Sequence, residues 1–191
     1  MFDTLDDIRE DAVRRLGRAA TDRRSPMHTP VVATADADLR VMVLRAFDAQ
    51  AWCLRFHTDT RAPKVAAIAD NPQVGVLFYD KAEKVQIRCR GIARVEPDSA
   101  TAQAAWEAGS NFARRCYLGD GPGTVKDSAA SGLPDAFEGH EPTDEELLPA
   151  RANFAVLLVQ IEQLDWLYLA HEGHRRAQFG LPSGESRWVT P

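Results

Sequence analysis

The sequence has few of the residues that mark a disulfide-rich, metal-binding or membrane protein. Its three cysteines, Cys53, Cys89 and Cys116, are odd in number and form no C-x-x-C pair, so neither a disulfide framework nor a thiolate zinc site is expected. No apolar run approaches the ~18 residues of a membrane span, and residues 1–24 contain no hydrophobic leader. These absences predict a cytoplasmic protein that does not insert into a membrane.

Lysine is also scarce, because only Lys64, Lys81, Lys84 and Lys126 are present and nearly all positive charge is arginine. The 23 basic and 28 acidic residues give a net charge of −5. This balance argues against a protein that coats nucleic acid or anionic membranes. The 191 residues are 45% hydrophobic, so a single domain over residues 1–191 with an ordinary core is expected.

Most familiar catalytic motifs are missing. The sequence has no Walker loop, no G-x-G-x-x-G after a strand and no G-x-S-x-G elbow. Residues 119–123 are glycine-rich, but Pro122 fits a plain loop better than a phosphate-binding loop. His171 and His174 have the spacing of a metal pair, yet no third ligand lies at a telling distance. A solvated turn is therefore expected over residues 171–174, and no metal site.

Hydrophobic periodicity predicts a mainly β fold with peripheral helices. Residues 4–22 form an amphipathic helix that Thr4 and Asp7 would cap. The strand-like run over 51–57 alternates bulky and polar residues, which is typical of a half-buried strand. We expect strands over 29–34, 39–47, 51–57, 74–79, 85–95, 154–161 (extended through 166–170), 175–179 and 187–190, with helices over 63–70 and 98–115. The sum predicts an antiparallel β-barrel.

Residues 119–149 hold five glycines and four prolines, too many for regular structure. A stretch of this length inside a compact domain is typical of a lid, an interface arm or a disordered segment.

Three short segments place cations where an anion could bind. Arg40 and Arg45 flank an apolar strand and point to opposite faces, so they would serve two anions or two ends of one site. Residues 57–64 run from a strand end into a helix start, where backbone N–H groups with Arg61 or Lys64 could hold a phosphate. The alternative for that segment is a capped helix with exposed cations. Residues 86–91 alternate long polar groups, which by itself indicates a solvent-facing edge.

Taken in order, these segments resemble the FMN-binding split barrel of the pyridoxamine 5′-phosphate oxidase family. The family pattern is R-x-V-L-L-K, an aromatic before threonine, S-R-K at a helix start, N-P, and Q-V-x-x-x-G. The counterparts are Arg40–Arg45, His57-Thr58, Ala62-Pro63-Lys64, Asn71-Pro72 and Gln86-Ile87 followed by Gly91. The similarity covers residues 28–118 well and 153–191 loosely.

The resemblance implies a homodimer that binds FMN in two clefts at the subunit interface. It implies that Arg40 and Lys64 hold the FMN phosphate, with Arg61 replacing the family arginine that is Pro63 here. The backbone of Val41, Met42, Val43 and Leu44 would follow the isoalloxazine ring. The remaining implied cofactor contacts are His57, Thr58 and Gln86, with Trp166 and Arg176 from the second subunit.

On the substrate side the resemblance implies Arg45 and Arg114 as anion holders and His174 and Arg176 as catalytic residues, His174 also binding substrate. The tyrosine expected near Arg114 and the first arginine of the family's R-L-H-D-R block are absent. The implied activity is an FMN-dependent oxidase, which moves hydride from an amine or alcohol carbon of a small molecule, such as a phosphorylated pyridine, to flavin N5, with reoxidation by O2. The alternatives are a flavin reductase or electron-transfer flavoprotein, and a non-catalytic module that binds FMN or pyridoxal phosphate.

Overall fold

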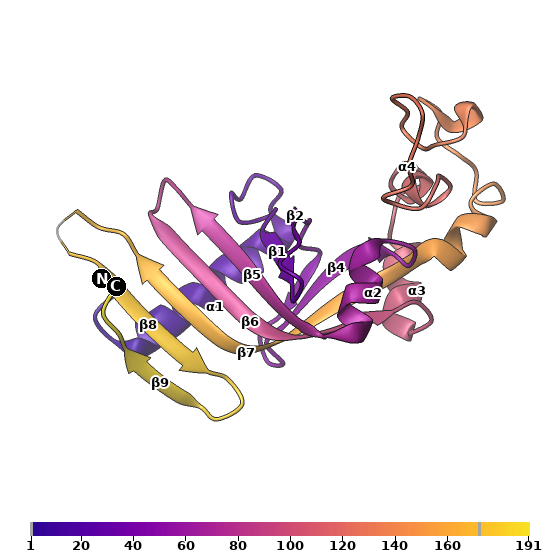
Figure 1. Cartoon of the computed structure of the whole chain (residues 1–191). Coiled ribbons are helices and arrows are strands. Elements are labelled where there is room, and N and C mark those ends of the chain that lie inside the picture. The colour runs from indigo at the N-terminus through magenta and orange to yellow at the C-terminus, as the bar shows by residue number, and fades with distance from the viewer. Residues whose placement is uncertain (1, 172) are drawn as a thin grey trace.

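The computed structural model describes residues 2–171 and 173–191, so the turn expected over 171–174 lies partly outside the described residues. Its described part confirms the predicted antiparallel, mainly β fold: one sheet has the strand order β2-β1-β5-β6-β7-β4-β3, and β8 and β9 extend it beside β7 (Figure 1). The strands are β1 Val31–Thr34, β2 Leu39–Val41, β3 Ala46–Asp48, β4 Cys53–Asp59, β5 Gln73–Asp80, β6 Val85–Glu96, β7 Phe154–Tyr168, β8 Arg175–Gly180 and β9 Glu185–Trp188. Among the described residues, no helix has the length and apolar character to cross a membrane.

The barrel closes through residues 42–45, which connect the two edge strands β2 and β3. The N–H groups of Met42 and Leu44 donate to the carbonyl oxygens of Pro30 and His28 at 3.0 and 2.9 Å. The next N–H, that of Arg45, donates instead to the carbonyl of Arg55 at 2.8 Å. The strand expected over 39–47 is therefore interrupted, because its middle must bond to both edges of the sheet.

The long strands β6 and β7 form the centre of the sheet. Their register shifts between Arg90 and Gly91, where a Cβ on Gly91 would lie 2.0 Å from the carbonyl oxygen of Gln160. Only glycine fits this close approach. Strand β7 is continuous to Tyr168, so the extension expected over 166–170 is confirmed except for its last two residues.

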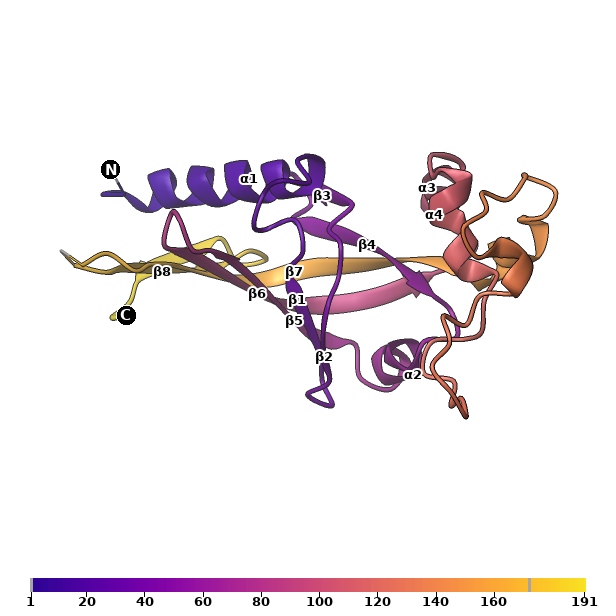
Figure 2. The same ribbon diagram turned by 90° about the horizontal axis from the view of Figure 1, so that it is seen from above.

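Helix α1, Leu5–Thr21, lies along one face of the barrel (Figure 2). The expected capping box is present: Thr4 Oγ1 accepts from the Asp7 N–H at 3.1 Å, and Asp7 Oδ2 accepts from the Thr4 N–H at 3.0 Å. The apolar stripe of α1, including Ile8 and Leu16, is fully buried against the strands. Burial of each such side chain stabilises the fold by roughly 1.5–3 kcal/mol.

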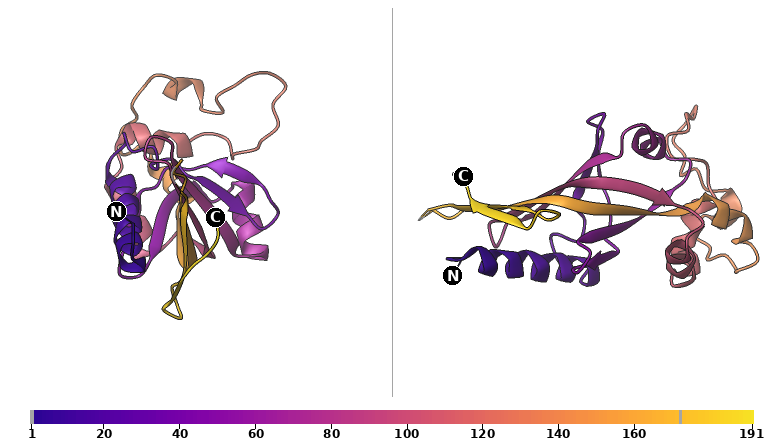
Figure 3. Two further views of the ribbon diagram at one scale, coloured as in Figure 1. Left: turned by 90° about the vertical axis from the view of Figure 1, so that its left-hand side faces the viewer. Right: turned by 90° about the horizontal axis from the view of Figure 1, so that it is seen from below.

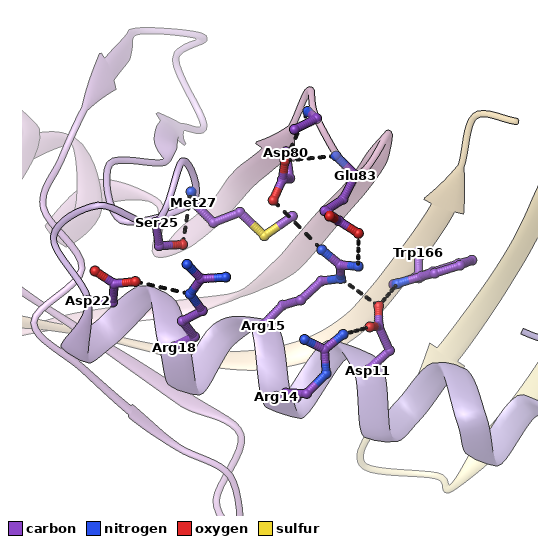
Figure 4. Close-up of polar contacts among 11 residues, drawn as sticks. Asp11, Arg14, Arg15, Arg18, Asp22, Ser25, Met27, Asp80, Glu83 and Trp166 are labelled. Atoms are coloured by element: carbon purple, nitrogen blue, oxygen red, sulfur yellow. Dashed lines mark hydrogen bonds and ion pairs between the residues drawn. The ribbon is translucent and has the colours of Figure 1, made fainter. Parts of the chain in front are cut away.

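A buried polar network fixes α1 to the sheet (Figure 4). Asp11 accepts hydrogen bonds from the indole N–H of Trp166 at 2.9 Å and from Arg15 Nε at 2.7 Å, and it also pairs with Arg14. Arg15 in turn lies 3.8 Å from the carboxylate of Asp80. Each buried polar group here has a partner, which removes most of the cost of burying it.

The remaining helices are α2, Pro63–Asp70, as the sequence predicts, and the pair α3, Ala100–Glu107, and α4, Asn111–Arg114. The single helix expected over 98–115 is broken because Ser110 caps α4, accepting from the Ala113 N–H at 3.3 Å. Residues 119–149 are irregular apart from short 3₁₀ turns. They lie at the end of the barrel opposite the two termini (Figure 3).

Candidate functional site

Arg40 on strand β2 and Lys64 at the start of α2 lie close enough for their charges to interact. Lys64 occupies the first turn of α2, whose N-cap residue Ala62 supplies no side-chain cap. Partial burial and the positive charge of Arg40 both lower the pKa of Lys64. Its neighbours Asp38 and Asp59 form their ion pairs with Arg40 and Arg61 instead. No carboxylate of the described residues lies within 4.0 Å of the Lys64 ammonium, so the pair favours an incoming anion.

Arg40 is held against the β1–β2 hairpin. Its guanidinium donates to Thr34 Oγ1 at 3.1 Å and to the Val32 carbonyl at 3.3 Å, and it pairs with Asp38. Asp38 is largely exposed, with 61% of its side chain accessible. An anion at this site therefore competes with a solvated carboxylate for the guanidinium.

Arg61 does not join this pair. Its Nε and Nη2 atoms donate to the two carboxylate oxygens of Asp59 at 2.9 and 2.7 Å, and Nη1 donates to the carbonyl of Gly119 at 3.0 Å. The hydrogen bonds to Asp59 raise the pKa of Arg61. Because these contacts engage the guanidinium, Arg61 would have to leave Asp59 or Gly119 to bind a phosphate. The Asp-x-Arg spacing was a local signal for this contact that sequence reasoning missed.

The linker from β2 offers one free backbone donor. The side chains of Met42 and Leu44 are buried in the core, whereas Val41 is 65% exposed. The N–H of Val43, between the two N–H groups that close the barrel, has no backbone acceptor among the described residues. Residues 41–44, which are expected to lie along the isoalloxazine ring, can therefore present the backbone of Val43 to a ligand, but not the buried side chains of Met42 and Leu44.

A second positive cluster surrounds His57 on β4. Burial and the charges of Arg45 and Arg55 lower the pKa of His57 to about 4, so the imidazole is neutral at pH 7. His57 Nε2 and Arg55 Nε are enclosed without hydrogen-bond partners among the described residues. Arg55 was not predicted, although strand alternation places it on the face of His57. Thr58 points to the opposite face and is buried, donating to the Asp59 carbonyl at 3.3 Å.

The expected substrate residues Arg45 and Arg114 are not brought together by a shared contact. Arg114 bonds to Asp144 at 3.3 Å and to the Glu107 carbonyl at 2.9 Å, and it stacks on Trp106. Burial raises the pKa of Tyr117, and the charge of Arg45 opposes part of that rise, so Arg45 lies near the segment that follows α4.

Trp166 is a core residue. Its side chain is fully buried within the chain, bonded to Asp11 and 4.7 Å from the ring of Phe2. A side chain enclosed in this way cannot reach a cofactor held by a second subunit. We therefore correct its expected role: Trp166 anchors α1 to the barrel.

Arg176 lies on the open face of the sheet, the face that α1 leaves uncovered. It bonds to Asp165 at 2.8 Å, as do Arg88 at 2.8 Å and Gln178 at 2.9 Å. Burial raises the pKa of Asp165, but these hydrogen bonds outweigh it and hold that pKa below its ordinary value. The cluster lines a pocket of about 600 Å³. Gln86 lies on the same face of the sheet, in the row next to that of Arg88 and Asp165. His174 is exposed just before β8.

The residues at the first site fit a phosphorylated, flat cofactor. Arg40 and Lys64 supply the positive charge that a phosphate needs, and the unbonded Val43 N–H lies on the segment between them and the His57 cluster. This fold with this site defines an FMN-binding split barrel.

Comparison with known proteins agrees with that class. Residues 13–97 match the model of the pyridoxamine 5′-phosphate oxidase, FMN-binding domain. The chain is 39% identical over 88 residues to the pyridoxine/pyridoxamine 5′-phosphate oxidase of Maricaulis maris, a segment that is 44% of this chain and 36% of that protein. The chain thus matches little more than a third of the length of this curated relative.

Solved structures extend the likeness over almost the whole chain. A pyridoxamine 5′-phosphate oxidase-related, FMN-binding protein from Nostoc punctiforme superposes with a TM-score of 0.74 at 25% identity, covering 95% of this chain and 96% of that one. PhzG from Burkholderia lata, solved with tetrahydrophenazine-1-carboxylic acid, shares the fold with a TM-score of 0.66 at 14% identity, over 95% and 91% of the chains. Residues 13–97 are thus similar to the FMN-binding domain of the pyridoxamine 5′-phosphate oxidases, and almost the whole chain has the split-barrel fold. Both the matched domain and the Nostoc punctiforme protein bind FMN, the cofactor that the sequence predicts.

Proposed function

We propose that this flavoprotein is an FMN-dependent oxidase that acts on an amine or alcohol carbon of a small anionic molecule. The observation that carries the proposal is the pair Arg40 and Lys64, in which the half-buried Lys64 ammonium at the start of a helix has no ion pair among the described residues. When bound, FMN supplies a ring that accepts hydride and is reoxidised by dioxygen.

In this proposal Lys64 and Arg40 hold the phosphate by charge-assisted hydrogen bonds. The N–H of Val43 orients the ring, with Gln86 as a further cofactor contact. Thr58 is buried on the opposite face of β4 from His57, so a contact between its side chain and the cofactor requires the ring to lie on that face. Because His57 is neutral, it can accept or donate a hydrogen bond beside the ring without adding a third charge.

The substrate side rests on the second positive cluster. Arg45 and Arg55 both lie close enough to His57 to lower its pKa, so an anionic group of a substrate, such as the phosphate of a pyridine or an amine, would find two guanidinium partners there. The exposed His174 and the partly buried Arg176 remain the proposed substrate-side catalytic residues, brought to the site by a partner subunit.

We further propose that the chain works as a homodimer that forms through the open face of the sheet. The strand register places Val41, Leu77, Arg88 and Asp165 in one row on that face. Leu39 and Val41 are 63% and 65% exposed there, an apolar surface that a second copy would cover. The same face carries Arg176, so one subunit's arginine would complete the other's site.

The absorbance spectrum of the purified protein tests the proposed function. We expect a yellow protein that releases FMN on denaturation and whose flavin is bleached anaerobically by pyridoxamine 5′-phosphate or another amine. A colourless protein that fails to bind added FMN contradicts the proposal. Flavin that only a nicotinamide donor bleaches would instead support the reductase alternative.

A further inference from the structure

Residues 119–132, here called the strap, form a closed loop rather than a loose segment. The Asp120 N–H donates to the Gly132 carbonyl at 2.8 Å, which ties the two ends together. A Cβ on Gly119 would lie 2.7 Å from the same carbonyl oxygen, so the ends are in close contact. Lys126 pairs with Asp120 across the loop. Loops of this kind, packed on their own residues, are compact surface units.

The strap rests on the start of α2. A Cβ on Gly121 would lie 3.2 Å from Arg61 Cβ, and a Cβ on Gly123 would lie 3.3 Å from Pro63 Cγ. Figure 2 shows the chain after α4 passing beside α2. The backbone of the strap therefore contacts the residues that directly precede Lys64, the cation of the proposed phosphate site.

Arg61 connects the strap to the barrel. Asp59, at the end of β4, is buried, and its carboxylate accepts from the Arg61 side chain and from the Arg61 N–H at 2.8 Å. The remaining Nη1 atom of the guanidinium donates to the carbonyl oxygen of Gly119 in the strap. A guanidinium fixed on one side by a bidentate carboxylate is well placed to hold a loop on its other side.

We propose that Arg61 is a positioning residue that fastens the strap over the phosphate end of the FMN site and so slows the departure of FMN. The inference rests on the proposed cofactor site. Arg61 acts on the cofactor through the strap and does not contact the phosphate. The glycine at position 123 serves the same purpose, because its positive φ of 90° and its missing Cβ let the strap lie against Pro63.

The rate of FMN dissociation, followed by the recovery of FMN fluorescence on dilution, tests the proposal. Gly123→Ala displaces the strap without changing any charge, and we expect about tenfold faster dissociation, equivalent to about 1.4 kcal/mol. Arg61→Gln should act similarly. Gly139→Ala is the matched control, since Gly139 also has a positive φ, of 74°, but its Cβ would meet nothing within 4 Å. It should dissociate FMN at the wild-type rate.

Two results would overturn the proposal. If only Arg61→Gln speeds dissociation, Arg61 contacts the phosphate itself. If neither variant does, the strap does not cover the site.

A cofactor-free measurement separates this inference from the proposed function. A lysine-specific protease cuts the strap after Lys126, and we expect faster cleavage there in Gly123→Ala and Arg61→Gln than in wild type or Gly139→Ala. Equal cleavage in all four proteins shows that Arg61 does not hold the strap, whatever FMN does. Wild-type protein that protects Lys126 but binds no FMN overturns the proposed function and, with it, the effect on FMN, while the contact between Arg61 and the strap stands.

Discussion

Replacing Lys64 with methionine should weaken FMN binding and stabilise the cofactor-free protein at the same time. Methionine keeps the length of the side chain and removes a half-buried charge that Arg40 repels and that has no ion pair in the part of the chain that the structure describes. Loss of one charged hydrogen bond to phosphate costs about 1.5–3 kcal/mol, which raises the dissociation constant of FMN by about 10- to 150-fold. Riboflavin lacks the phosphate, so its dissociation constant should change by less than about twofold.

The stability effect has a definite pH dependence. Because the pKa of Lys64 is lowered in the folded protein, the unfolded chain binds more protons, and the free energy of unfolding rises as pH increases through that lowered pKa. Thermal unfolding of cofactor-free wild type should show this rise on the alkaline side, and Lys64→Met should show a higher melting temperature at pH 7 without the rise. Arg40→Met is the contrasting variant, since loss of its bonds to Thr34 and Val32 should lower both stability and affinity. Equal weakening of FMN and riboflavin binding by Lys64→Met would refute the reasoning.

Three further variants test other parts of the structure. The pKa of His57 is about 4 when folded, against 6.5 in the unfolded chain, so stability should fall as pH drops from about 6.5 to about 4, and urea unfolding of His57→Phe should lack that fall. Asp11→Ala leaves Arg15 without its close partner and should cost about 3–5 kcal/mol in urea unfolding; a loss below about 1 kcal/mol contradicts the network. Asp165→Asn should lower the free energy of unfolding at pH 7 by about 1–3 kcal/mol. It should also remove the loss of stability that the wild-type protein shows below pH 4. If the variant loses stability below pH 4 as the wild type does, Asp165 keeps an ordinary pKa.

Local rules carried the sequence prediction where neighbouring residues decide the structure. The Thr4–Asp7 box and the Pro63 helix start depend on residues three or four positions apart, and both are present. The expected strand over 39–47 was too regular, because its interruption depends on hydrogen bonds to Pro30, just before β1, and to Arg55 on β4, at opposite ends of the strand order. Periodicity cannot reveal a segment that must close a barrel.

At the site, too, local patterns could be predicted from the sequence, whereas contacts between residues far apart in the sequence could not. Alternation could place His57 and Thr58 on opposite faces, but it could not show that Trp166 faces α1. Its partner Asp11 is 155 residues away in the sequence, and a tryptophan on a strand has the same pattern whether it packs on a helix or on a second subunit. For Arg61 the sequence shows a cation near a helix start, but the structure adds that its guanidinium bonds to its own carboxylate partner, Asp59.

A crystal structure of the protein with FMN tests the central claim most directly. We predict that the phosphate lies within ~2.7–3.2 Å of both Lys64 Nζ and the Arg40 guanidinium, with Asp38 displaced from Arg40. An FMN phosphate seated instead in the pocket lined by Arg88 and Arg176, with Lys64 in contact with solvent alone, would contradict it.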